Sequence, residues 1–225
     1  MADPDALAPP QTGGVDCLYV DDDLLVLAKP SGLLCVPGRG PDKQDCLSHR
    51  AQQQWPGALV VHRLDQATSG LVLMARHLDA QRRMSHAFAE RQVQKRYQAI
   101  VAGHMAAPTH GDWAEINLPI AADWERRPLR VIDPVLGKPS LTRWRALAHD
   151  ESANTTRIEL EPVTGRTHQL RVHLAAVGHA ILGDALYADA VIHAQHPRLL
   201  LHAAWLAFEH PATGQRIEIS LPAPF

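Results

Sequence analysis

The residues best suited to chemistry lie in one run, residues 62–70, which reads H-R-L-D-Q-A-T-S-G. Asp65 supplies a carboxylate, and Arg63 places a guanidinium two residues before it. An arginine partner favours the ionised carboxylate, and an ionised aspartate in a poorly hydrated site can attack an electrophilic carbon such as an anomeric carbon. Aspartate is also a common turn residue that bonds its own backbone, so the run by itself leaves a structural role open.

Two apolar segments flank this charged run, residues 59–61 before it and residues 71–74 after it. Their composition is typical of buried strands. A charged turn between two buried strands costs desolvation free energy, which favours a functional role for the turn.

A second candidate, Arg166, lies in a loop directly before a predicted helix that ends at Gly178. A guanidinium in that place can meet a carboxylate or a phosphate. The alternative is ordinary helix-start chemistry, with Thr164 or Thr167 as the N-cap and Arg166 in solvent.

A third candidate, Tyr97, lies on a strand predicted over residues 95–102. Its ring can stack on a nucleic-acid base, or its phenol can take part in proton transfer. Aromatic residues also favour the interior of sheets, so a core position is the alternative.

Formal net charge is −2, but the charge is unevenly spread. The first 23 residues hold six aspartates and no lysine or arginine, so the remainder carries 22 basic and 18 acidic side chains. Basic residues gather at 76–96 and at 126–145. A surface that is positive on one side suits a polyanion, although ordinary solvated charge explains the same pattern.

The 225 residues predict an α+β protein with a central, mainly antiparallel sheet flanked by helices and loops. Residues 1–14 are acidic and proline-rich and read as a disordered tail, which leaves 15–225 as one domain. Residues 119–139 form a long connection between strands. The other predicted elements are a hairpin over 18–27, helices at 44–54 and 79–92, and strands at 140–148, 155–162, 199–208 and 215–220.

Other classes of protein are disfavoured by composition. No apolar run approaches the roughly 18 residues that a membrane span needs, and the N-terminus lacks the pattern of a secretory signal. Three cysteines without metal or redox spacing indicate reduced thiols in a cytoplasmic protein. The fourteen histidines show no metal-ligand spacing, so no metal site is expected.

Several separated segments resemble, in order, the RluA family of RNA pseudouridine synthases. Beside the run at 62–70, the matching segments are residues 29–33 (K-P-S-G-L), 95–103 (K-R-Y-Q-A-I-V-A-G), the block from 164 to 187, and 200–203 with 210–211. Features at 36–39, 123–128 and 137–139 resemble the compact members that lack an N-terminal S4 domain and modify both 23S rRNA and tRNA. The resemblance implies a single catalytic domain of that family.

The resemblance also implies a role for each candidate residue. Asp65 would be the nucleophile, and Arg166 its basic partner. Tyr97 would pack against the uracil base and assist deprotonation at its C5 atom. Arg63 would fill the gap left by the flipped uridine, and flipping costs least in a loop, so hairpin loops are the expected targets. The reaction is an isomerisation without redox change, so no cofactor or metal is expected.

The expected partner is RNA, either 23S rRNA or a tRNA anticodon stem-loop, with no membrane and no obligate protein partner. The residues expected to contact RNA are Arg63, His62, Arg82, Arg83, Lys95, Arg96, Arg126, Arg127, Arg130, His168 and Arg171. Two other functions stay open: a hydrolytic nucleosidase that uses the same aspartate, and an RNA-binding protein without activity.

Overall fold

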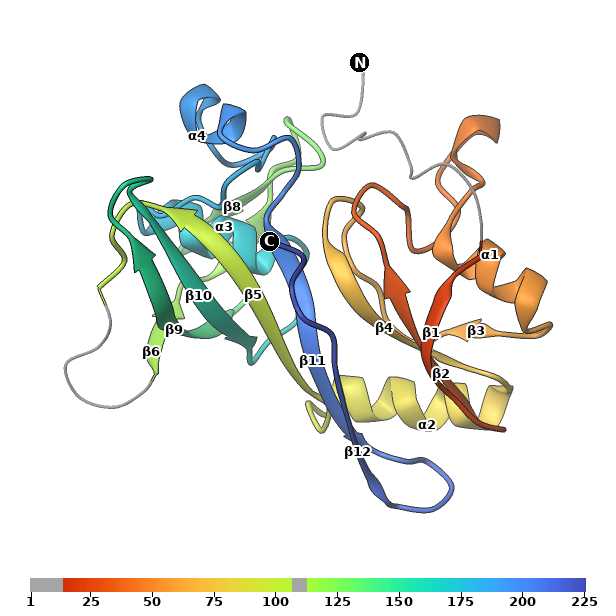
Figure 1. Cartoon of the computed structure of the whole chain (residues 1–225). Helices are drawn as coiled ribbons and strands as arrows, with labels where there is room; N and C mark the ends of the chain where they lie inside the picture. The colour runs from red at the N-terminus through yellow and green to blue at the C-terminus, as the bar shows by residue number, and fades with distance from the viewer. Residues whose placement is uncertain (1–13, 107–112) are drawn as a thin grey trace. The chain divides into compact units, whose positions relative to one another are not determined.

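A computed structural model describes residues 14–106 and 113–225 of the chain (Figure 1). The chain forms two compact units, which we call unit 1 (Met1–Lys95 with Ala203–Pro224) and unit 2 (Arg96–His202 with Phe225). The predicted disordered tail, residues 1–14, lies outside the described residues except for Gly14.

Unit 1 is built on an antiparallel sheet. Its strands run in the order β1 (Asp16–Val20), β2 (Leu24–Lys29), β4 (Ser69–Ala75) and β11 (Leu201–Glu209), with β12 (Arg216–Ser220) paired to β11 and the short β3 (Leu59–Val60) paired to β4. The predicted hairpin at 18–27 is confirmed, and its turn is held by Asp21, whose Oδ1 accepts hydrogen bonds from the backbone of Asp23 and Leu24.

Helix α2 (Leu78–Ala89) packs one apolar face on this sheet (Figure 1). Met84 and Ala80 contribute to a core cluster with strand residues such as Leu73 and Phe208. The helix is shorter than the predicted 79–92, because Arg91 adopts a left-handed backbone with φ 59° and ends it. The other helical elements of unit 1 are η1 (Pro41–Lys43) and α1 (Leu47–Gln54).

Close contact between two strands explains one glycine of the aspartate-containing run. A Cβ atom added to Gly70, at φ 117°, would meet the carbonyl oxygen of Ala203 at 2.4 Å. Only glycine therefore lets β4 follow the turn of Asp65 so closely beside β11.

Unit 2 carries a second antiparallel arrangement, with most of β5 (Gln94–Ala102), then β10 (Thr155–Pro162), β9 (Leu141–Asp150) and β6 (Ala114–Asn117). The helices of this unit are α3 (Gln169–Ala176) and the short α4 (Ala190–Ala194). Leu170 and Leu174 are buried on α3, and Gly178, at φ 87°, follows its C-cap as predicted.

The segment predicted as a plain connection, 119–139, contains an ordered two-stranded sheet. Strands β7 (Ile120–Ala122) and β8 (Arg130–Ile132) pair antiparallel, and Ile120 exchanges backbone hydrogen bonds with Lys138. Three-residue strands between prolines give too short an apolar alternation to be recognised in sequence. We call this element the β7–β8 hairpin.

The α+β class and the antiparallel pairing are confirmed within each unit. Among residues 14–106 and 113–225, no helix is long and apolar enough to cross a membrane.

Candidate active site

Asp65 lies half-buried in the loop between β3 and β4 of unit 1. Its carbonyl accepts a hydrogen bond from the backbone N–H of Thr68 at 3.2 Å, which closes a tight turn. Arg63, two residues earlier, is exposed.

The residues after β2 hold this turn in place. The Gln66 carbonyl accepts from the Gly32 backbone N–H at 2.9 Å, and the Gln66 side-chain amide donates to the Gly32 carbonyl at 3.0 Å. The Ser31 hydroxyl donates to the carbonyl of Ala67 at 2.7 Å. These hydrogen bonds to Gln66 and Ala67, the two residues after Asp65, fix the position of the backbone from which the Asp65 side chain extends.

We call the hydrogen bonds between residues 29–33 and the turn of Asp65 the clamp. Lys29 is the residue of this clamp that was not predicted from the sequence. Its side chain is 2% exposed, and its ammonium donates to the carbonyls of Pro30, Leu33 and Gln66 at 2.7–2.9 Å. Burial lowers the pKa of Lys29 to about 8, an effect opposed by the nearby Cys35 and Asp65. A lysine that ends a continuous apolar run, just before a proline, was the available signal.

Replacing Lys29 with methionine should destabilise the protein, because the buried carbonyl of Leu33 and the partly buried carbonyls of Pro30 and Gln66 lose their donor. The expected loss of unfolding free energy is about 2 kcal/mol or more. This net figure allows for the fact that methionine removes the cost of burying the lysine charge. Urea unfolding measures it, with the exposed Lys43→Met as a matched control expected to change stability by less than about 0.5 kcal/mol. Equal effects of the two substitutions would contradict a clamp role.

His62 is held inside unit 1. Its ring stacks on Phe88 with centroids 4.4 Å apart, and its Nε2 accepts a hydrogen bond from the backbone N–H of Leu73 at 2.9 Å. The ammonium of Lys95 lies over the ring of Phe88, 5.7 Å from its centroid. Burial, with a smaller contribution from the charge of Lys95, lowers the pKa of His62 to about 3. His62 therefore braces the aspartate-containing run, and its expected role as an RNA contact stays a prediction.

The lowered pKa of His62 gives stability a predictable pH dependence. The unfolded state binds a proton near pH 6.5 and the folded state only near pH 3, so this contribution is complete above pH 6.5 and is lost as pH falls. His62→Gln keeps an acceptor but cannot titrate. The difference in unfolding free energy between wild type and variant should shrink by about 1.4 kcal/mol per pH unit below pH 6.5. A difference independent of pH would contradict a neutral, buried ring.

In unit 2, the loop that carries Arg166 is organised by Gln169. The Gln169 Oε1 accepts from the Arg166 backbone N–H at 3.0 Å and from the Thr164 hydroxyl, while its Nε2 donates to the Leu141 carbonyl and the Thr142 hydroxyl oxygen. The Arg166 side chain is exposed and makes long, 3.4 Å contacts to the Pro139 carbonyl. The overlooked signal in the sequence was a polar glutamine at the start of an apolar helix, and in the structure this side chain is buried and hydrogen-bonded.

The start of α3 differs from both predicted caps. Neither Thr164 nor Thr167 is the N-cap, a position taken by His168 in a left-handed conformation with φ 57°. The His168 Nδ1 meets the Tyr187 hydroxyl at 2.6 Å, and that hydroxyl oxygen also accepts the Arg130 backbone N–H at 3.0 Å. Tyr187 thus joins two predicted RNA-contact residues, His168 and Arg130.

Arg171 does not lie on a surface. Its side chain is 1% exposed, and its guanidinium donates from Nε and Nη2 to the two carboxylate oxygens of Asp184 at 2.9 and 2.6 Å. Asp184 Oδ1 also accepts the backbone N–H groups of Leu186 and Tyr187. The pair holds the segment that presents Tyr187, which corrects the prediction that Arg171 contacts RNA.

Tyr97 is half-buried on β5, in register with Leu160 of β10. The neighbouring Arg96 faces Glu161, with 3.9 Å between their charged groups, and lies 5.8 Å from the Trp113 ring centroid. Arg96 is therefore partly occupied by contacts within the sheet.

Four other predicted RNA contacts are exposed, whereas Lys95 and Arg130 are half-buried. Arg82 and Arg83 lie on α2, where Arg83 pairs with Asp79 at 2.9 Å. Arg126 and Arg127 lie in the loop of the β7–β8 hairpin. Surface pairs of this kind stabilise little, so their charge can still serve a polyanion.

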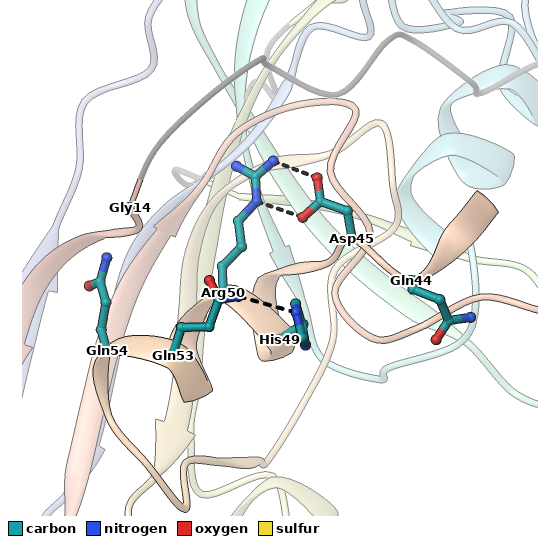
Figure 2. A pocket seen from close by; sticks show the side chains of 7 residues that line it. All are labelled: Gly14, Gln44, Asp45, His49, Arg50, Gln53 and Gln54. Carbon is teal, nitrogen blue, oxygen red and sulfur yellow. Dashed lines mark hydrogen bonds and ion pairs between the residues drawn. The ribbon is translucent and has the colours of Figure 1, made fainter. Parts of the chain in front are cut away.

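Two further features do not belong to this set. A polar hollow of about 580 Å³ beside α1 holds a two-bond Asp45–Arg50 ion pair (Figure 2); its lining residues are Gly14, Gln44, Asp45, His49, Arg50, Gln53 and Gln54. Asp21, Asp23 and His210 have ligand atoms within 4.8 Å of one another. His210 Nε2 lies 2.9 Å from Asp21 Oδ2, so these groups are used in hydrogen bonding.

The three predicted catalytic residues divide between the units. Asp65 lies in unit 1, and Tyr97 and Arg166 lie in unit 2. Within unit 1 the structure brings Lys29 to the turn of Asp65; within unit 2 it links the loop of Arg166 to the β7–β8 hairpin.

Comparison with known proteins covers both units. A family model described as RNA pseudouridylate synthase matches residues 23–176. The dual-specificity RNA pseudouridine synthases RluA of Pasteurella multocida strain Pm70 and of Escherichia coli strain K12 are 45% and 44% identical over 217 residues, each alignment covering 96% of this chain and 97% of the relative. A solved structure, human RNA Pseudouridylate Synthase Domain Containing 1, has a TM-score of 0.79 at 30% identity and covers 97% of this chain and 87% of its own.

The family match spans more than half of the chain, and the relatives align almost end to end. The chain therefore belongs to the RNA pseudouridylate synthase family, the isomerases that convert uridine in RNA to pseudouridine.

Proposed function

We propose that this enzyme acts on uridines in hairpin loops of two kinds of RNA, 23S rRNA and the tRNA anticodon stem-loop. The support for two substrates is its identity of 45% over nearly its whole length to a relative described as dual-specific. We also propose that it works in the cytoplasm without an obligate protein partner, since the residues assigned to the reaction all lie on this one chain.

Asp65 is the proposed nucleophile, and the clamped turn that holds it is the observation that carries this assignment. Its carboxylate attacks C1′ of the uridine, and the C1′–N1 bond breaks with its electron pair on N1 of the uracil. The uracil turns, C5 bonds to C1′, and the bond to Asp65 breaks. Loss of the C5 proton and gain of a proton at N1 complete an isomerisation. Release of the base through a glycal-like intermediate, enabled by the same Asp65, is the other route.

The other residues orient and stabilise. Tyr97 lies against the base and assists removal of the C5 proton, and Arg166 supplies the cation that partners Asp65. Arg63, exposed beside the turn, fills the gap left by the flipped uridine. Arg82, Arg83, Arg126 and Arg127, all exposed, contact phosphates.

The release of tritium from C5 of labelled uridine tests this function directly, because C5 loses its hydrogen only when the C1′–C5 bond forms. We expect release from an anticodon stem-loop and from a 23S rRNA hairpin, and much slower release when the target uridine is paired in a duplex, where flipping costs more. Free uracil in solution would instead indicate a hydrolytic nucleosidase. Tight RNA binding without release would indicate an RNA-binding protein.

A further inference from the structure

Trp124 is unusual among the five tryptophans of the chain. It is 71% exposed at the loop of the β7–β8 hairpin, whereas Trp144 is buried and the others are partly buried. A large aromatic ring left in water gains nothing for the fold, so its position favours a role in binding.

Arg127 braces this ring. Its guanidinium carbon lies over the indole, 4.0 Å from the ring centroid. A guanidinium at this distance covers one face of the ring and adds a positive charge beside it. The high exposure of Trp124 leaves the opposite face to solvent. The pair is a flat surface with one open side.

The loop that carries this pair is held by its own hydrogen bonds. Asp123 Oδ1 accepts the Arg126 backbone N–H at 3.0 Å, and Asp123 Oδ2 accepts from the Arg126 guanidinium at 2.8 Å. The Asp123 backbone N–H donates to the Leu129 carbonyl at 3.1 Å. A preorganised loop loses little conformational entropy when it binds.

The β7–β8 hairpin is tied to α3 at both of its ends. Tyr187 contacts His168 and accepts the backbone N–H of Arg130, which pairs with Ala122 beside the loop. At the base of the hairpin, His173 Nε2 contacts the carbonyl of Leu118 at 2.9 Å. With three residues in each strand at about 3.3 Å per residue, the loop stands roughly 10 Å from the base. Trp124 is thus presented at a fixed distance from the loop of Arg166, within the same unit.

We propose that Trp124 is a stacking platform for an unpaired base of the substrate RNA, at a position other than the reacting uridine. The inference rests on the proposed action on hairpin loops, which supply unpaired bases. Arg126 and Arg127 in this loop, with Arg130 at the start of β8, carry three positive charges beside the carboxylates of Asp123 and Glu125, and these guanidinium groups suit the adjoining phosphates.

Stacking also fits an enzyme with two substrates. Every base has a flat face, so an aromatic platform tolerates differences of sequence that hydrogen bonds to base edges would reject. The platform would bind any unpaired base at this position of the RNA loop, whichever of the four bases it is. Exposed Val135 and Leu136 in the turn after β8 offer a rival use of this surface, an apolar contact with a protein, and in that case no base of the RNA would couple to Trp124.

A double-mutant cycle tests the platform. Trp124→Ala is combined with hairpins in which each unpaired nucleotide except the target is replaced, one at a time, by an abasic residue. At one position we expect the variant and the abasic substitution each to weaken RNA binding and kcat/KM by about 5- to 150-fold, and the two together to cost no more than either alone. Trp124→Phe should recover most of the loss.

Val191→Ala is the matched control, because Val191 is an apolar residue 73% exposed on α4 of the same unit. It should change neither binding nor kcat/KM. Thermal unfolding of Trp124→Ala should match wild type, which excludes a collapsed hairpin as the cause.

The platform is overturned if no loop position couples to Trp124, or if Trp124→Ala weakens binding equally for every abasic hairpin, as an apolar contact with something other than a base would. Failure of the proposed function looks different. In that case wild type releases no tritium from either hairpin, while the binding arm of the cycle still decides whether Trp124 stacks on a base.

Discussion

Asp65→Asn should abolish tritium release from both hairpins, with kcat lower by at least about 10⁴-fold, the order found when an enzymatic nucleophile is removed. The amide is neutral and a poor nucleophile, yet nearly the same shape as the carboxylate. The turn depends on backbone groups of residues 65–67, so the variant should fold normally.

Two measurements separate loss of chemistry from loss of structure in this variant. Affinity for hairpin RNA, followed by fluorescence anisotropy, should stay within about threefold of wild type, which is less than 1 kcal/mol. Retained tritium release by Asp65→Asn would remove Asp65 from its assigned role. Lost affinity without tritium release would point to a positioning role.

Asp184→Asn should cost the largest amount of stability, because it leaves the buried guanidinium of Arg171 without a counter-charge. Breaking a buried ion pair from one side typically costs about 3 to 5 kcal/mol. Asparagine keeps an oxygen for the backbone N–H groups of Leu186 and Tyr187, so the effect reports mainly on the charge.

Urea unfolding measures this loss, and the exposed pair Arg83–Asp79 provides the comparison. Asp79→Asn should cost no more than about 0.5 kcal/mol, since both side chains are more than half exposed. A double variant, Arg171→Met with Asp184→Leu, should be less destabilised than Asp184→Asn. Equal losses for Asp184→Asn and Asp79→Asn would contradict a desolvated pair.

Local patterns predicted most strands and helices of this fold. Alternation marked β5, and a three-aspartate turn between apolar runs marked the β1–β2 hairpin. Helix ends were less well predicted, since Arg91 ends α2 by adopting a conformation that non-glycine residues seldom take. The β7–β8 hairpin was missed because each strand has only three residues.

The candidate site was only partly visible in the sequence. Asp65 stands out by its charged neighbours, but the clamp around it consists largely of backbone carbonyls, which have no signature in residue type. Arg171 shows the opposite failure, because spacing on a helix placed it beside His168 and could not reveal a partner thirteen residues later. Burial of a charge depends on its distant partner, and sequence periodicity carries no record of it.

The hydroxyl of Tyr187 has a consequence for experiments in solution. It accepts the backbone N–H of Arg130, so the exchange of that one amide hydrogen with deuterium reports how often the β7–β8 hairpin detaches from the segment that carries Tyr187. Tyr187→Phe should accelerate exchange at Arg130 while the amides of β10 keep their protection. Exchange at the Arg130 amide therefore measures opening of the hairpin with and without RNA, and it needs no label near Trp124.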